Sequence, residues 1–183
     1  MKKLLLVLLM GFSILAIYAQ HEQSNQEEQT NTDVYFGKQE VKLNALFLIA
    51  GAIDVGYEYI LKEESSLGIH AMVAYDDSIR DNIQYFISPY YRYYFGEKYA
   101  AGFFLEGFGM LNSSERDLDL LFDDGEENYV TDFALGIGLG GKWITKSGFI
   151  GEIYVGYGRN LFKADESEYD LIGKGGISIG YRF

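Results

Sequence analysis

Apolar and polar residues alternate along this chain from residue 41 to the C-terminus. The last stretch, GKGGISIGYRF at residues 173–183, carries isoleucine and aromatic residues on one face and small or polar residues on the other. The two sets are Ile177, Ile179, Tyr181 and Phe183, and Ser178, Gly180 and Arg182. Because successive side chains of a strand point to opposite faces, this period of two predicts a β-strand that ends at the final aromatic residue.

The same alternation predicts seven further strands, which brings the total to eight. They cover residues 41–50, 53–61, 67–75, 83–95, 100–111, 129–143 and 149–160. In the first of them, one face carries Val41, Leu43, Ala45, Phe47 and Ile49. Pro89 falls in the fourth predicted strand and has no N–H to donate, so we expect it at a strand end or a bulge.

Eight such strands predict an all-β fold, an eight-stranded antiparallel up-and-down transmembrane β-barrel over residues 41–183. A tilted strand of about ten residues crosses the apolar band of roughly 25 Å that such barrels present to lipid. The connections alternate between short ones, expected in the periplasm, and longer external ones. The short ones are 62–66, 96–99 and 144–148, and the longer ones are 76–82, 112–128 and 161–172. The turn at Gly51 and Ala52 should also be external, but it is shorter than this scheme expects.

The alternation alone does not say which face points inward. The charged residues and one histidine share their face with glycines, as a narrow and crowded lumen requires. They are Lys42, Asp54, Glu58, His70, Arg92, Glu106, Asp132, Lys142, Glu152 and Arg182. A soluble barrel of lipocalin type would turn its apolar face inward. Three features favour the apolar face outward, toward lipid. They are the terminal aromatic residue, the export signal at residues 1–19 described below, and the aromatic residues near strand ends.

Residues 1–19 are typical of a secretory signal peptide. Lys2 and Lys3 form a positive n-region, residues 4–17 are apolar, and the small-residue site predicts cleavage after Ala19. The apolar run is short for a retained membrane anchor. Residues 20–40 are rich in Gln, Glu, Asn and Thr, which predicts a disordered periplasmic tail. A binding arm is the alternative for this segment.

The composition excludes several classes of function. The chain has no cysteine, so disulfides, thiolate metal sites and cysteine nucleophiles are excluded. Loss of Lys2 and Lys3 with the signal peptide leaves 13 of 15 basic residues against 27 acidic ones, a net charge of about −14. This charge excludes nucleic acid as a partner. The glycines at residues 136–141 lie within a strand that no helix follows, so they are no phosphate loop, and we predict no cofactor.

The inward charges form the most informative candidate set. An eight-stranded barrel is too narrow for a water-filled pore, and charges buried in it must be paired. We hypothesise a lumen network in which Arg92 and Arg182 bridge Glu58, Glu106 and Glu152. Such a network is either an ionic plug, the interpretation that we favour, or part of a path for protons or solutes.

No other residues predict catalysis, and we expect no enzymatic activity. His70 is the only histidine of the predicted barrel, because His21 lies in the tail, and no serine stands at a supporting spacing. The loop at residues 115–127 is rich in acidic residues, but its spacing does not match a calcium-binding EF-hand loop. We interpret it as a solvated acidic loop and predict no metal site, and calcium titration would test this.

The terminal GISIGYRF, with Tyr181 and Phe183, resembles the C-terminal assembly signal of Gram-negative outer-membrane barrels. Together with SPYYRYYFG at residues 88–96 and FFLEGFG at residues 103–109, it makes the chain resemble the small eight-stranded outer-membrane barrels of the OmpX and OmpA type, in particular porin-like barrel domains of unassigned function. The resemblance implies a monomer in the outer membrane, in contact with lipid, lipopolysaccharide and the barrel assembly machinery.

We therefore expect a non-enzymatic outer-membrane protein with a structural or surface-interaction role. The external loops 76–82, 112–128 and 161–172 would contact an unidentified surface ligand. The alternatives are a narrow channel for ions or small solutes, a lipid-modifying outer-membrane enzyme, and a soluble lipocalin-like carrier.

Overall fold

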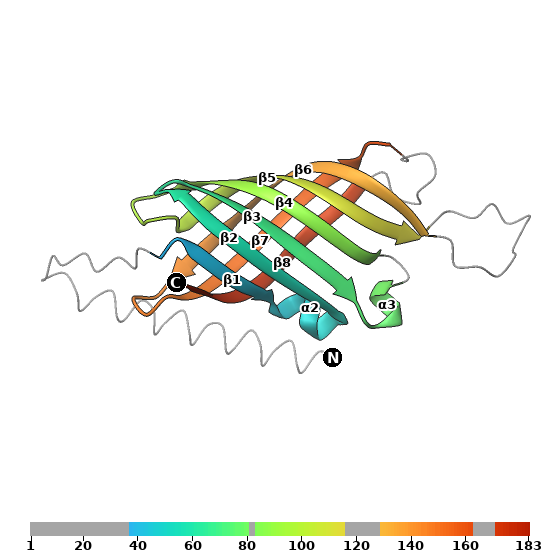
Figure 1. Ribbon diagram of the computed structural model, residues 1–183, viewed down its shortest axis with the longest axis horizontal. Helices are drawn as coiled ribbons and strands as arrows, with labels where there is room; N and C mark the ends of the chain where they lie inside the picture. Colours follow the sequence, from blue (N-terminus) through green and yellow to red (C-terminus); the bar gives the residue numbers. More distant parts are fainter. Residues whose placement is uncertain (1–36, 81–82, 116–128, 163–170) are drawn as a thin grey trace, which may run out of the picture. The chain divides into compact units, whose positions relative to one another are not determined.

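The chain folds into a closed barrel of eight antiparallel strands in sequence order (Figure 1). The computed structural model describes residues 37–80, 83–115, 129–162 and 171–183, all within one compact unit, Val34–Phe183. The strands are β1 Gln39–Asn44, β2 Ala52–Lys62, β3 Ser65–Ala74, β4 Ile83–Phe95, β5 Gly102–Glu115, β6 Tyr129–Ile144, β7 Phe149–Asn160 and β8 Leu171–Arg182. This architecture confirms the predicted fold class. The predicted signal peptide, and the predicted tail up to residue 36, lie outside the described residues.

The barrel closes between β1 and β8. Glu40 pairs with Arg182 and Asn44 with Ser178, and the backbones of Gln39 and Phe183 exchange two hydrogen bonds of 3.1 and 2.9 Å. Tyr181 and Phe183 point outward at this closure, where the Tyr181 ring contacts that of Phe149 edge-on. The last strand therefore closes the barrel at its final aromatic residue, as the alternation predicts.

The alternation also sorts side chains between the two faces of the wall. Ile69, Ile137 and Val155 are exposed on the outer face, and Trp143 is 60% exposed there. The predicted inward residues are buried, from Lys42 on β1 to Arg182 on β8. The apolar face is therefore the outer one. Among the described residues, no helix is long and apolar enough to cross a bilayer.

The first predicted strand is wrong over its second half. β1 ends at Asn44, and residues Ala45–Ala50 form the short helix α2. The Asn44 side chain accepts a hydrogen bond from the Phe47 N–H and caps this helix, and Gly51 ends it with a φ of 120° that favours glycine. The segment ALFLIA is apolar at every position, so it carries no period that separates helix from strand. The external connection after β1 is therefore a helix and a glycine, which resolves the turn that seemed too short at Gly51.

The boundary predicted at residue 40 is also too late. Gln39 and Glu40 belong to β1, and the Glu40 side chain is fully buried. The remaining connections fall at two ends of the barrel (Figure 1). The turn end holds the connections at residues 63–64, 96–101 and 145–148 and the closure of β1 on β8, and the loop end holds α2, the four-residue helix α3 (Asp77–Arg80) and the longer connections.

Helix α3 begins directly after the exposed Asp76. Asp76 accepts hydrogen bonds from the hydroxyl and the backbone N–H of Ser78, which lower the pKa of Asp76 below its ordinary value. This turn is the described part of the predicted external loop 76–82.

Pro89 lies in the middle of β4, not at a strand end or a bulge as predicted. It faces outward and pairs with Ile69 of β3. β4 and β5 pair in one register on both sides of it, at Ile87↔Leu111 and at Tyr90↔Phe108. Between Tyr85 and Phe95, pairing with β5 lapses at residues 88 and 89, because proline has no N–H to donate. The strand tolerates the proline at the cost of a local break in one ladder.

Candidate functional site

The lumen is filled by two apolar clusters with a layer of charged side chains between them. The loop-end cluster consists of Ala52, Met72, Phe86, Tyr90, Phe108, Met110, Ala134 and Ile172. The turn-end cluster consists of Ile60, Tyr94, Ala100, Phe104 and Tyr154. The ionic layer consists of Glu40, Lys42, Glu58, Arg92, Glu106, Lys142, Glu152, Lys174 and Arg182, all buried. Along β4 the order is Tyr90, Arg92, Tyr94, so on that strand the charge lies between the two clusters.

Glu58 of β2 is the centre of the ionic layer. Its carboxylate accepts five hydrogen bonds, from residues on three other strands. The donors are Lys42 Nζ at 2.5 Å, Lys142 Nζ at 2.6 Å, Tyr94 OH at 2.6 Å, Tyr90 OH at 3.0 Å and Arg92 Nη1 at 3.1 Å. This number of donors compensates the burial of a full negative charge.

Arg92 of β4 joins three carboxylates on three strands. Its Nε donates to Glu106 at 2.7 Å, and its Nη1 donates to Glu152 at 2.7 Å and to Glu58 at 3.1 Å. The guanidinium also lies 4.4 Å from the centre of the Tyr90 ring and 4.2 Å from that of Phe104. The structure thus brings Arg92 together with all three glutamates of the hypothesised network.

Arg182 is placed differently from that hypothesis. It does not bridge Glu58, Glu106 or Glu152 but donates to Glu40 at 2.8 Å and to the carbonyls of Tyr99 and Ala100 at 2.9 and 2.8 Å. The reason is the register, in which Arg182 is the direct cross-strand neighbour of Glu40 at the turn end. Arg182 therefore fastens the turn between β4 and β5 to the closure of the barrel.

Three lysines complete the layer. Lys42 on β1 donates to Glu152 on β7 at 2.9 Å, past the intervening strand β8. Lys142 donates to Glu40 at 2.7 Å as well as to Glu58, so it bridges two carboxylates that are cross-strand neighbours. Lys174 on β8 donates to Glu106 on β5 at 2.6 Å. These ion pairs join strands that are not neighbours in the wall, and Lys142–Glu58 spans the lumen from β6 to the opposite strand β2, so a solute that crossed the lumen would have to break them.

Sequence reasoning missed Glu40 and Lys174 as lumen residues. Glu40 was assigned to the tail, although it stands two residues before Lys42 and so shares its face. Lys174 has the same parity as Ser178 and Arg182 on the last strand. In both cases the same alternation, continued toward the N-terminal end of the strand, would have found the residue.

A protein-family model matches residues 6–177 of the chain, and it describes a protein of unknown function (DUF3575). The chain belongs to this family. No curated protein matches its sequence. The N-terminal β-barrel domain of Pseudomonas aeruginosa OprF is similar in structure, with a TM-score of 0.57 and 14% identity over 80% of this chain and 98% of that domain. Neisserial surface protein A (NspA) gives a TM-score of 0.49 and 13% identity over 80% and 95% of the two chains. With the closed eight-stranded topology, the OprF likeness confirms the predicted fold.

His70 lies in the lumen of this DUF3575 chain with an aspartate on one side. Its Nδ1 is 3.0 Å from the Asp54 carboxylate, and its ring lies between those of Tyr90 and Tyr154. No serine stands at a supporting spacing in the sequence, but the strand register makes Ser88 on β4 the cross-strand neighbour of His70. However, the Ser88 hydroxyl accepts from Lys174 at 3.3 Å, and His70 Nε2 has no hydrogen-bond partner among the described residues. The pair of nucleophile and base that catalysis needs is not formed.

The acidic loop that was considered as a metal site lies largely outside the described residues. Residues 116–128, which make up most of the acidic loop 115–127, lie outside the described residues. In the part of the chain that the structure describes, no group of three histidine, aspartate or glutamate side chains could hold a metal ion.

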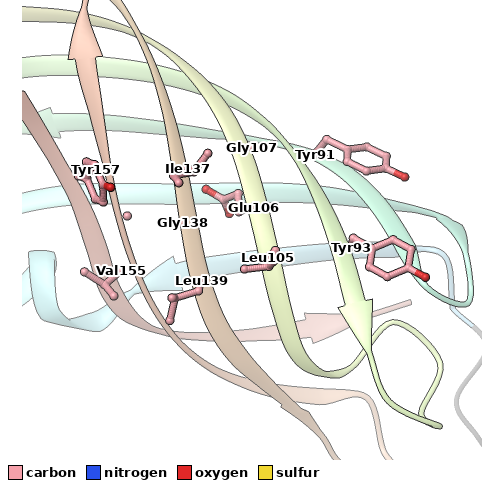
Figure 2. Close-up of a pocket in the computed structure, with 11 residues that line it drawn as sticks. Tyr91, Tyr93, Leu105, Glu106, Gly107, Ile137, Gly138, Leu139, Val155 and Tyr157 are labelled. Carbon is pink, nitrogen blue, oxygen red and sulfur yellow. The ribbon is translucent and has the colours of Figure 1, made fainter.

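The outer wall carries an apolar groove over β4 to β7. Figure 2 shows Tyr91 and Tyr93 along one side of it and Val155 and Tyr157 along the other. The groove has a volume of about 440 Å³. It forms because Gly107, in its floor, carries no side chain, and a Cβ there would meet no atom within 4 Å. The hollow belongs to the outward apolar surface and not to the lumen.

Proposed function

We propose that this chain is an integral outer-membrane protein whose barrel is a closed, non-conducting anchor. Its role is structural or in surface interaction and is carried by the external connections predicted at residues 76–82, 112–128 and 161–172, although residues 112–115 belong to β5 and residues 171–172 to β8. The single observation that carries this proposal is the ionic layer that crosses the lumen between two apolar clusters, inside a wall whose outer face is apolar.

The outer face supports a location in a membrane. Large apolar side chains are exposed on all eight strands, among them Ile137 at 64% and Val55 at 42%. A soluble monomer rarely exposes a contiguous apolar patch of more than a few hundred Å². An apolar wall around a polar interior is instead the arrangement of a transmembrane barrel, and it disfavours the soluble lipocalin-like carrier.

The lumen supports an anchor more than a channel. Lys142–Glu58 joins the opposite strands β6 and β2, Arg92–Glu152 joins β4 to β7, and the charged side chains of these pairs are fully buried. The loop-end cluster, with Phe86, and the turn-end cluster, with Phe104, fill further parts of the lumen with apolar side chains. A narrow channel for ions or small solutes therefore remains the second candidate, and conduction through it would require these pairs to open.

The enzymatic alternative has less support. A lipid-modifying enzyme needs a base and a nucleophile at a surface that lipid can reach. His70 and Ser88 are both buried in the lumen, and each contacts a charged residue in place of the other.

Several expectations are part of this proposal. The signal peptide is cleaved after Ala19, and Tyr181 and Phe183 serve as the assembly signal that the barrel assembly machinery reads. The folded chain is a monomer in contact with outer-membrane lipid and lipopolysaccharide, and it has no nucleic-acid partner.

Cell fractionation and single-channel recording test the proposal together. We expect the full chain in the outer-membrane fraction, with a heat-modifiable shift on a gel between folded and boiled samples. In planar bilayers we expect no stepwise conductance from the purified protein. Discrete conductance steps whose size or frequency changes in Arg92→Leu, while the heat-modifiable shift persists, would establish the channel instead. Recovery from the soluble fraction would contradict the membrane location.

A further inference from the structure

The wall of the barrel has a gap at its loop end. β1 has six residues, whereas the other strands have 10 to 16. Its pairing with β2 stops at Leu43↔Val55 and its pairing with β8 at Asn44↔Ser178. Among the described residues, no strand pairs with residues 52–54 of β2 or 171–177 of β8 on that side. Unpaired backbone inside hydrocarbon is costly, so something must cover this edge.

Helix α2 covers the gap and contacts both β2 and β8 (Figure 1). The Asn44 side chain, at the start of α2, joins β8 to β2. Its amide donates to the Gly175 carbonyl of the unpaired β8 edge at 3.3 Å and to Asp54 of β2 at 2.9 Å. Phe47 packs against the loop-end cluster and contacts Phe86 edge-on, with ring centres 6.4 Å apart. The helix is thus fastened to the barrel by Asn44 and Phe47.

A crevice lies between helix α2 and the outer side of β7 and β8. Its volume is about 460 Å³. Its lining carries no charged side chain and consists of Leu46, Phe47, Ala50, Ile153, Tyr154, Val155, Gly175, Gly176 and Ile177. Gly176 must be a glycine here, because a Cβ at this position would collide with the Asn44 side chain. Tyr154 belongs to the turn-end cluster of the lumen, so the crevice reaches through the gap in the wall.

We propose that this crevice binds one acyl chain of a membrane phospholipid. The proposal rests on the proposed membrane location, since the crevice opens onto the outer face that lipid would cover. It also has the features of a ligand site, because its volume falls in the usual range of about 300–1,000 Å³ and its side chains are almost all apolar. None of the six residues of α2 is buried by protein, and Leu46 and Ile49 are 50% and 75% exposed, so the helix itself lies in contact with lipid.

Photo-crosslinking tests the site in the full folded chain. The probe is phosphatidylethanolamine with a diazirine near the end of one acyl chain, in phosphatidylethanolamine–phosphatidylglycerol vesicles. We expect labelling at Ile153 and Ile177 to exceed labelling at Val55 and Ile69, on the outer face of β2 and β3, by about threefold or more. Equal labelling of the two surfaces would overturn the crevice while leaving the membrane location intact. No labelling at either surface would overturn both.

Two tryptophan variants of α2 make a matched pair. Ala50→Trp fills the crevice, and we expect it to reduce labelling at Ile153 and Ile177 at least threefold while labelling at Ile69 is unchanged. Ile49→Trp, on a residue that does not line the crevice, should leave both unchanged. The heat-modifiable shift checks folding, and Ala50→Leu takes the place of a variant that fails to fold. Undiminished labelling at Ile153 in a folded Ala50 variant would contradict the site.

Discussion

At the scale of single residues, the buried charges set the stability of this protein. Glu58 shows why, because one carboxylate accepts from two lysines, an arginine and two tyrosines. A buried ion pair is not in itself strongly stabilising, since both charges lose their hydration. Removal of a single partner is destabilising, however, because it leaves the others buried without compensation.

Glu58→Ala should therefore lower the free energy of unfolding by about 3–5 kcal/mol. Lys42 and Lys142 would keep their charges in the lumen and lose their shortest hydrogen bonds. Urea unfolding in detergent micelles, followed by the fluorescence of the single tryptophan, measures the change. Asp77→Asn on the exposed helix α3 is the control and should leave the midpoint unchanged. A Glu58→Ala midpoint equal to that of the wild type would show that the lumen is hydrated.

At the scale of elements, Pro89 gives the clearest test. It interrupts the β4–β5 ladder at residues 88 and 89 without a shift in register. Pro89→Val restores one N–H to the ladder and keeps an apolar side chain toward lipid, so we expect it to stabilise the barrel by about 1 kcal/mol. Ile87→Val, also outward on β4, is the control and gains no hydrogen bond. The same urea titration measures both, and a less stable Pro89→Val variant would mean that the proline is needed for the shape of β4.

The elements also show how far the sequence determines this fold. A period of two identified all eight strands and the outward face of each, because the two faces meet chemically different surroundings. The period failed at residues 45–50, where every residue is apolar and the decision between helix and strand depends on the Asn44 cap. The alternation also could not predict the ion-pair partner of Arg182. Alternation says that a residue points inward but not at what height, and the height depends on the stagger between strands.

At the scale of the whole molecule, the two ends of the barrel should face different compartments. The short turns, the start of β1 and the end of β8 lie at the turn end, and the helices α2 and α3 lie at the loop end (Figure 1). In outer-membrane barrels the short turns face the periplasm and the longer loops face outward.

Because the chain contains no cysteine, single cysteines can report this orientation. Asp77→Cys on α3 should react with a membrane-impermeant maleimide on intact cells. Lys146→Cys, in the turn between β6 and β7, should react only after the outer membrane is disrupted. The opposite pattern would mean that the barrel is inserted the other way round.

The central claim is that the apolar outer wall faces lipid while the charges stay sealed inside. A tryptophan moved to the middle of the wall tests it most directly, with Trp143→Phe and Ile137→Trp combined in one chain reconstituted in vesicles. Ile137 is 64% exposed on the outer face of β6. We expect phospholipids with brominated acyl chains to quench its fluorescence strongly and aqueous iodide to leave it unchanged. Quenching by iodide without quenching by brominated lipid would place the apolar wall in water and contradict the claim.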